Sequence, residues 1–223
     1  MNALSKTLFL FVIGLTACTA ELSGTKVSAP TISVYGYVND PAYKTECLDI
    51  NPTTFQSPVN FLGIYPGKTT SEQVKKLLGE PSKVFATGEG SNWFYDKNEN
   101  IFISTIFIGN IVDRIDVVNQ DKNHPSLDEI AGELGCPNLM TLVDQSEHSD
   151  GNYNMAVFIY PEIGVEYWFE FLGTKLTLER VATEIRYIKP MALDDYINSY
   201  NPFLSVNSPY IKPVFWNEIV SSK

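Results

Sequence analysis

Two acidic groups in this sequence could support chemistry, and the first is a pair of glutamates. Glu166 and Glu170 are four positions apart, and in a strand both would lie on the same face as Trp168. Paired carboxylates can cleave glycans, with one acting as acid and the other as base or nucleophile. The same pattern also arises on the solvent side of a sheet whose other face is buried. A cell-wall glycan-binding or hydrolytic function is therefore the alternative that we keep open.

The second acidic group contains Asp144, Glu147, His148 and Asp150, which fall within seven residues. Carboxylate and imidazole groups can bind cations, but the spacing matches no calcium loop, and a solvated hairpin tip has the same composition. The sequence also lacks the metalloprotease pattern His-Glu-x-x-His and the hydrolase pattern Gly-x-Ser-x-Gly. We expect a protein that is not an enzyme and has no metal or cofactor.

The N-terminus predicts the compartment. Residues 1–6 carry one Lys, and Thr7–Leu15 is an apolar run that is too short to span a membrane. The run ends in Leu15-Thr16-Ala17-Cys18, which fits the bacterial lipobox; an ordinary secretory signal with an incidental Cys is the alternative. We expect residues 1–17 to be a signal peptide and Cys18 to carry acyl chains such as palmitate. Thr19, in place of Asp, favours the outer membrane if the host has one, and otherwise the outer face of the cell membrane.

The overall charge restricts the partners. The chain has 16 basic and 26 acidic residues, and removing residues 1–17 would remove Lys6 and no acid, which leaves 15 − 26 = −11. A chain this acidic lacks the basic face that nucleic-acid binding needs, and anionic lipid would repel it. We therefore expect no nucleic-acid partner and a membrane attachment that depends on the lipid at Cys18.

The remaining cysteines suggest a cross-link. Once Cys18 is lipidated, Cys47 and Cys136 are left as an even pair in an extracytoplasmic protein, and such pairs often form disulfides. Two unpaired buried thiols are the alternative.

A repeated phrase predicts two similar helices. Thr70–Pro81 and Ser126–Pro137 align without a gap at an offset of 126 − 70 = 56 residues. Each copy opens with a hydroxyl residue followed three positions later by Gln or Glu, which is a capping box. Each closes in Leu-Gly-x-Pro, which ends a helix.

Alternating hydrophobic runs predict four strands after each helix. The fold class expected is α+β, with two tandem units that each pack a short helix on a four-stranded antiparallel meander. We place the lipidated N-terminus, tether and lead-in at 18–57, the units at 58–121 and 122–190, and a C-terminal helix with a Pro- and aromatic-rich tail at 191–223. The expected strands are 82–86, 92–96, 101–108, 111–119, 138–143, 155–160, 165–172 and 176–189.

One strand is notably aromatic. In Asn92–Asp96, alternation puts Trp93 and Tyr95 on one face and Phe94 on the other. Trp93 and Tyr95 are either covered by packing or form an exposed platform for a partner, for which Trp and Tyr are suited.

Residues 59–119 resemble the BamE (SmpA/OmlA) domain of outer-membrane assembly lipoproteins. The resemblance rests on Gly67-Lys68-Thr69, on Leu78-Gly79-Glu80-Pro81 and on Asn92-Trp93-Phe94-Tyr95, with a closing strand from Asn110. A tandem of such units also resembles the architecture of β-lactamase inhibitory protein. Both relatives act through protein contacts without catalysis.

These resemblances imply a non-enzymatic protein-binding or scaffold module in the cell envelope, with an unidentified protein partner and a role such as outer-membrane protein assembly. The candidate contact residues are Trp93, Tyr95 and Trp168.

Overall fold

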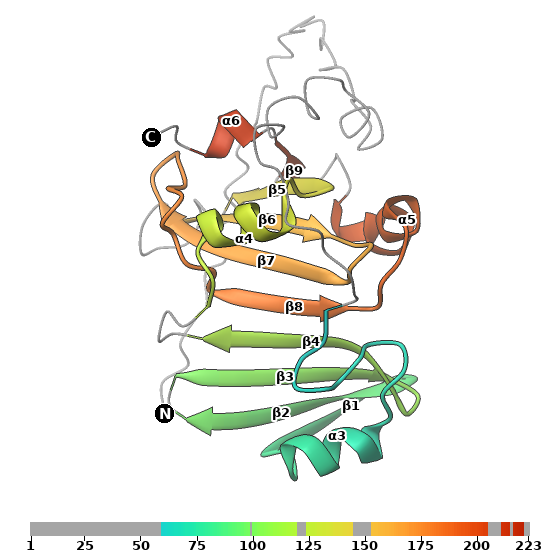
Figure 1. Cartoon of the computed structure of the whole chain (residues 1–223). Helices are drawn as coiled ribbons and strands as arrows, with labels where there is room; N and C mark the ends of the chain where they lie inside the picture. The colour runs from blue at the N-terminus through green and yellow to red at the C-terminus, as the bar shows by residue number, and fades with distance from the viewer. Residues whose placement is uncertain are drawn as a thin grey trace, which may run out of the picture. The chain divides into compact units, whose positions relative to one another are not determined.

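The strands form one antiparallel sheet (Figure 1). The structure is a computed structural model that describes residues 59–98, 100–119, 124–144, 153–204, 211–214 and 216–220. All of them belong to the second of two units into which the chain divides, residues 32–223. The described strands are β1 (Lys83–Thr87), β2 (Gly90–Asn98), β3 (Ile101–Ile108), β4 (Ile111–Asn119), β5 (Leu139–Asp144), β6 (Tyr153–Tyr160), β7 (Val165–Leu172), β8 (Glu184–Ile188) and β9 (Ile211–Pro213). Their order in the sheet is β1-β2-β3-β4-β8-β7-β6-β5-β9.

The expected fold of two tandem helix-plus-four-strand units is wrong, because the sheet is continuous through β4 and β8. Arg114–Val118 of β4 pair with Glu184–Ile188 of β8 at five positions. Had the units been separate, each of these strands would have left an unpaired edge. Their pairing satisfies the backbone groups and buries Ile115, Val117 and Ile185.

The second half also departs from a simple meander. Only Glu184–Ile188 of the expected strand 176–189 forms a strand, and residues 173–183 are irregular with isolated bridges at Leu176 and Val181. A ninth strand, β9, pairs with the outer edge of β5.

The two predicted helices are confirmed with their caps. In α3 (Ser71–Leu78) the amide N of Gln73 donates to Thr70 Oγ1 at 3.3 Å, and the Thr70 amide donates to Gln73 Oε1 at 2.8 Å. In α4 (Leu127–Leu134) Ser126 and Glu129 make the same pair of bonds, at 3.3 and 2.7 Å. Reciprocal bonds of this kind satisfy amides that an uncapped helix leaves free.

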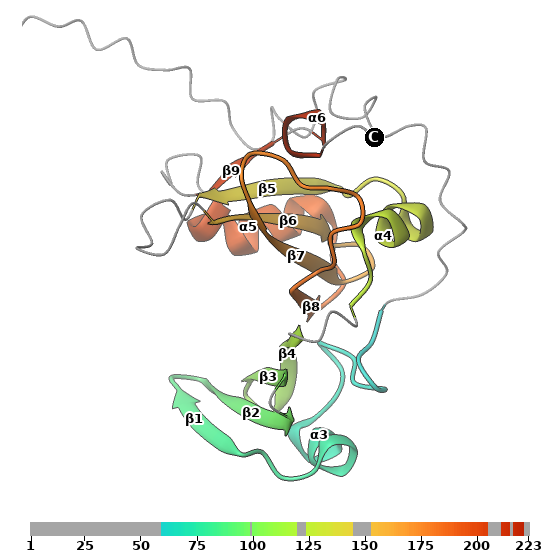
Figure 2. The same ribbon diagram turned by 90° about the vertical axis from the view of Figure 1, so that its left-hand side faces the viewer.

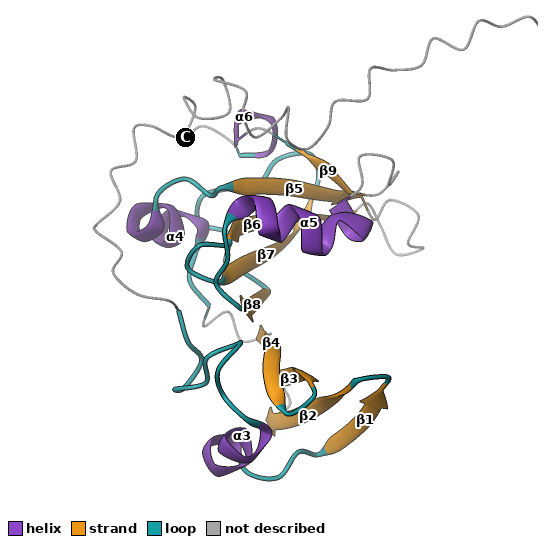
Figure 3. Ribbon diagram, turned by 90° about the vertical axis from the view of Figure 1, so that its right-hand side faces the viewer, coloured by secondary structure: helices purple, strands orange, loops and turns teal. Residues whose placement is uncertain are grey.

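The helices divide between the two faces of the sheet (Figures 2 and 3). α3 and α4 lie on one face, where Val74 and Leu78 pack with Phe107 of β3, and Leu127 and Ile130 pack with β-strand residues such as Phe158. α5 (Leu193–Leu204) lies on the other face, where Tyr196 and Ile197 pack against Leu139, Val157 and Ile159. The remaining short helix is α6 (Trp216–Ile219). Among the described residues, no helix is long and apolar enough to cross a membrane.

Candidate functional site

The aromatic strand β2 turns Trp93 and Tyr95 toward α3. Tyr95 is only 2% exposed and belongs to the core cluster under that helix. Trp93 is half-buried, with its ring 4.6 Å from that of Phe107 and the Lys75 ammonium 5.3 Å from its centroid. This placement fits the packing alternative, and a side chain as buried as Tyr95 offers a partner almost no surface.

The opposite side of β1–β4 is free of helices in Figures 2 and 3 as far as the chain is described. On the same side, α5 packs against Ile188 of β8 and Trp168 of β7. We call this side of β1–β4, β8 and β7 the open face. Alternation from the buried Tyr95, Ile115 and Ile185 assigns the following side chains to it: Phe85, Asn92, Phe94, Phe102, Ser104, Arg114, Asp116, Trp168, Glu184 and Arg186.

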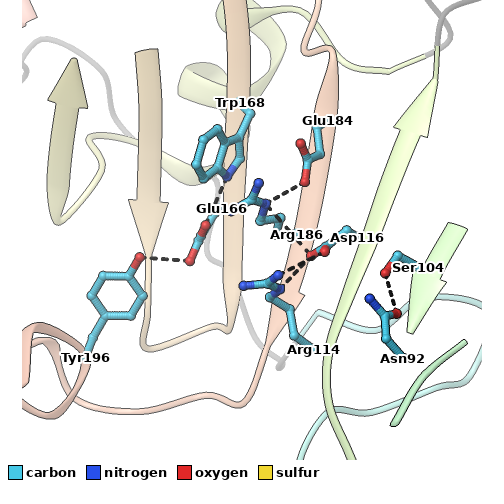
Figure 4. Close-up of polar contacts among 9 residues, drawn as sticks. All are labelled: Asn92, Ser104, Arg114, Asp116, Glu166, Trp168, Glu184, Arg186 and Tyr196. Atoms are coloured by element: carbon cyan, nitrogen blue, oxygen red, sulfur yellow. Dashed lines mark hydrogen bonds and ion pairs between the residues drawn. The ribbon is translucent and has the colours of Figure 1, made fainter. Parts of the chain in front are cut away.

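Strand register aligns one row of side chains across the open face. Phe94 pairs with Ser104, Ser104 with Asp116, Asp116 with Arg186, and Arg186 with Glu166. The row therefore runs from β2 to β7 and places the guanidinium of Arg186 between carboxylates on both neighbouring strands, as Figure 4 shows.

Arg186 is the centre of a charged and aromatic network (Figure 4). Its guanidinium carbon lies 3.5 Å from the ring centroid of Trp168, a cation–π contact. Its Nε donates to Glu184 Oε1 and lies 3.8 Å from Asp116 Oδ1. These contacts fix the guanidinium on the open face from several directions.

Arg114 extends the network along β4. Its Nη2 donates to Asp116 Oδ2 at 3.1 Å, and its Nε lies 2.8 Å from Asp116 Oδ1 as an ion pair without hydrogen-bond geometry. On the neighbouring strands, the hydroxyl of Ser104 donates to Asn92 Oδ1 at 2.8 Å.

Glu166 is held in place. It is 3% exposed, and one carboxylate oxygen accepts the Tyr196 hydroxyl of α5 at 2.8 Å while the other accepts Trp168 Nε1 at 3.0 Å. Glu170 is exposed on the same strand, and a four-residue step spans about 13 Å of extended backbone. Glycosidase carboxyl groups are about 5–9.5 Å apart, so Glu166 and Glu170 are poorly placed for glycan cleavage.

The charges of the side chains in this network nearly cancel. Two guanidiniums (Arg114, Arg186) face three carboxylates (Asp116, Glu166, Glu184), which gives 2 − 3 = −1. Burial raises the pKa of Asp116, although the guanidiniums of Arg114 and Arg186 oppose that change. For Arg186, burial alone lowers the pKa, but the bond to Glu184 and the charges of Glu184, Asp116 and Glu166 outweigh it and raise the pKa.

Aromatic side chains occupy the outer part of the open face. The ring centroid of Phe94 lies 5.4 Å from that of Phe85 and 5.3 Å from that of Phe102. Phe85 is 44% exposed on the outermost strand, with the Lys83 ammonium 4.4 Å from its centroid. The open face thus presents an apolar end beside a charged centre.

Several predicted residues fall elsewhere. Cys18, Cys47, Glu147, His148 and Asp150 lie outside the described residues, and of Asp144 only the backbone is described, in β5. The structure records Cys136 as a free thiol and holds no disulfide within the described residues, so the pairing with Cys47 stays a prediction. Trp168 is the one predicted contact residue on the open face.

Sequence reasoning missed the role of Arg114, Asp116, Glu184 and Arg186. Alternation already puts Arg114 and Asp116 on one face of β4. Their partners on β8 become visible only with the pairing between β4 and β8.

No protein-family model and no curated protein sequence matches this chain. A cysteine-rich secretory protein from Staphylococcus aureus is similar in structure, with 9% identity over 79% of this chain and 55% of its own and a TM-score of 0.40. A DUF4309 family protein from Bacillus subtilis shares 15% identity over 71% and 95%, with a TM-score of 0.37. A putative β-lactamase inhibitor protein from Streptococcus mutans shares 14% identity over 66% and 96%, with a TM-score of 0.25.

The chain spans about half the length of the Staphylococcus protein. A putative β-lactamase inhibitor protein is thus among the similar structures, and membership of the BamE family is not shown. At TM-scores of 0.40 and below, these likenesses carry no argument about function.

Proposed function

We propose that this protein is a non-enzymatic, lipid-anchored module of the cell envelope that binds a protein partner on its open face. The observation that carries the proposal is the arrangement of Arg186 and Trp168. Their stacked side chains lie 3.5 Å apart at the centre of the open face, and the guanidinium is already fixed by Glu184 and Asp116.

Such an arrangement favours binding for two physical reasons. Arg and Trp are enriched among the residues that dominate protein interfaces. A guanidinium held by its neighbours also loses little further freedom when a partner arrives, which lowers the entropic cost of association. The Phe85, Phe94 and Phe102 rings beside it supply apolar area.

The binding surface can be tested with two neighbours on the exposed strand β1. Phe85 is 44% exposed on the open face, and Val84 is 53% exposed on the opposite face. A photo-crosslinking amino acid at position 85 is expected to capture a stoichiometric envelope protein, and the same amino acid at position 84 is the matched control. Phe85→Asp should abolish recovery of that protein from detergent-solubilised membranes at low salt, and Val84→Asp should not.

Equal crosslinking from both positions, or recovery of no stoichiometric protein, would contradict the proposed surface. Retention on peptidoglycan fragments that Trp168→Ala abolishes would instead favour the glycan-binding alternative.

Lipid anchoring is a separate part of the proposal. Cys18→Ser is expected to release the protein into the soluble fraction, because the acyl chains would be its main hold on the membrane. A protein that stays in the membrane fraction after this substitution would remove the anchoring part and leave the open face untouched.

A further inference from the structure

The segment between β7 and β8 is irregular but firmly held. Residues 177–183, in the orange connection at the left of Figure 1, bond to the start of α4, to the end of β4 and to β7. The Leu127 amide donates to Arg180 O at 2.9 Å, the Asn119 amide donates to Thr183 O at 3.2 Å, and the Thr183 amide donates to Trp168 O at 2.8 Å. Two further bonds, from Asp128 N to Leu178 O and from Ala182 N to Pro125 O, complete the attachment.

This segment forms one wall of a surface cavity. The cavity has a volume of about 530 Å³, and its other wall comes from Val118 at the end of β4 and Glu170 on β7. Small-molecule sites commonly have volumes of about 300–1,000 Å³ and are largely formed before the ligand arrives. The backbone bonds of the segment give this cavity such a preformed wall.

Three charged side chains line the cavity. Glu170 comes from β7, and Glu179 and Arg180 come from the fixed segment, which also contributes the hydroxyl of Thr177. All three charged residues are exposed. Within the described part of the chain none of the three is in an ion pair, whereas Arg114 and Arg186 on the open face are both paired.

The mixture of charges narrows the ligand class. Two carboxylates would repel a phosphate or a nucleotide, and the guanidinium of Arg180 would repel a metal ion. Consistently, the described residues contain no group of three or more metal-ligating side chains. A ligand that matches both signs needs a cationic group for the carboxylates and an anionic group for the guanidinium.

We propose that the cavity lined by Glu170, Glu179 and Arg180 binds a small zwitterionic ligand of the amino-acid class. Its ammonium group lies toward the two carboxylates, and its carboxylate pairs with the Arg180 guanidinium, the geometry that Arg favours for carboxylates. Because the site carries 1 − 2 = −1, a ligand with a second cationic group, such as lysine, is preferred over glycine. This site adjoins the open face, because Glu170 and Trp168 share one side of β7, but its lining includes neither Trp168 nor Arg186.

Calorimetric titration of the full-length Cys18→Ser chain tests the site, with lysine, glycine, putrescine and acetate as probes. Lysine is expected to bind most tightly, glycine more weakly, and putrescine and acetate at least tenfold more weakly than lysine. Arg180→Gln and Glu170→Gln are each expected to weaken lysine binding by about tenfold, the low end for a hydrogen bond to a charged group. Glu72→Gln, an exposed substitution on α3, is the matched control and should leave the affinity unchanged.

Amide chemical shifts locate the binding independently of its strength. Addition of lysine should move resonances of residues 177–183 and leave those of α3 in place. The absence of saturable lysine binding at millimolar concentration would overturn the proposal. So would acetate or putrescine binding as tightly as lysine, or Arg180→Gln and Glu170→Gln variants that both bind lysine like the unsubstituted protein.

Discussion

Replacing Tyr95 and Tyr160 by Phe should change stability in opposite directions, although both hydroxyls are buried. Tyr95 is 2% exposed, and no residue in the described part of the chain makes a hydrogen bond with its hydroxyl. Tyr160 is 4% exposed, and its hydroxyl donates to Gly135 O at 2.9 Å. Burial, with a smaller contribution from the Glu80 carboxylate, raises the pKa of Tyr95 to about 12, so its hydroxyl is neutral at physiological pH.

The magnitudes follow from the cost of burying polar groups. A buried hydroxyl without a partner costs about 1–3 kcal/mol, so Tyr95→Phe should raise the free energy of unfolding by about 1 kcal/mol. Tyr160→Phe removes a hydrogen bond and leaves the Gly135 carbonyl buried, which should lower the free energy of unfolding by about 1–2 kcal/mol. The two variants should therefore differ by about 2–3 kcal/mol, or by about 4–12 °C in Tm for a chain of this size.

Urea denaturation followed by circular dichroism and by Trp fluorescence measures this difference. Each variant retains the aromatic ring, so the slope of the transition should stay the same. A Tyr95→Phe variant that loses 1 kcal/mol or more would refute the reasoning, because it would show that the hydroxyl makes a stabilising bond. Capture of the envelope partner should be unaffected by Tyr95→Phe, since this side chain lies in the core under α3.

Four other expectations follow from local features. Leu62 is exposed and has a φ of 51°, a backbone conformation that Gly adopts more easily than Leu. In the same urea titration, Leu62→Gly should leave the free energy of unfolding unchanged or raise it by up to about 1 kcal/mol. Leu77→Gly, an exposed substitution inside α3, should lower it by about 1 kcal/mol. Thr70→Ala and Ser126→Ala should each lower the free energy of unfolding by about 1 kcal/mol, and a loss below about 0.3 kcal/mol would show that these side chains do not cap their helices. Burial raises the pKa of the Cys136 thiol from 9.0 to about 11. Because the thiolate is the reactive form, alkylation of Cys136 at about pH 8 should be about 100-fold slower than that of an unperturbed thiol, and its rate should rise about tenfold per pH unit. Fast alkylation at neutral pH would contradict this expectation. Because the sheet is continuous through β4 and β8, urea unfolding should be one transition that coincides for all probes, and two separated transitions would count against a single cooperative sheet.

Local features of the fold could be predicted from the sequence because their determinants lie close together. The capping residues Thr70 and Gln73 are three positions apart, as are Ser126 and Glu129, and both helices begin where these pairs predict. Strands β3, β4 and β7 have the predicted bounds, since each is a run of β-branched and aromatic residues between turns.

Pairing over long sequence separations could not be predicted in the same way. Asp116 and Arg186 are 186 − 116 = 70 residues apart, and no turn between β4 and β8 fixes their register. Alternation correctly separated Trp93 and Tyr95 from Phe94, but it does not say which side of a strand a helix will cover. That choice depends on where α3 packs, and α3 covers the side that carries Trp93 and Tyr95.

The side on which the helices pack also decides where a binding surface can form. Because α3 and α4 lie on the same face (Figures 2 and 3), Phe107, Ile115 and Ile185 are buried on that face, and the charged side chains of β4 and β8 share the opposite face. Pairing of β4 with β8 then brings Asp116 beside Arg186, and pairing of β8 with β7 brings Arg186 beside Glu166. A half-buried guanidinium is stable only when carboxylates compensate the loss of hydration. The join between the two halves of the sheet therefore creates and balances the charged centre of the open face, and neither half could do so alone.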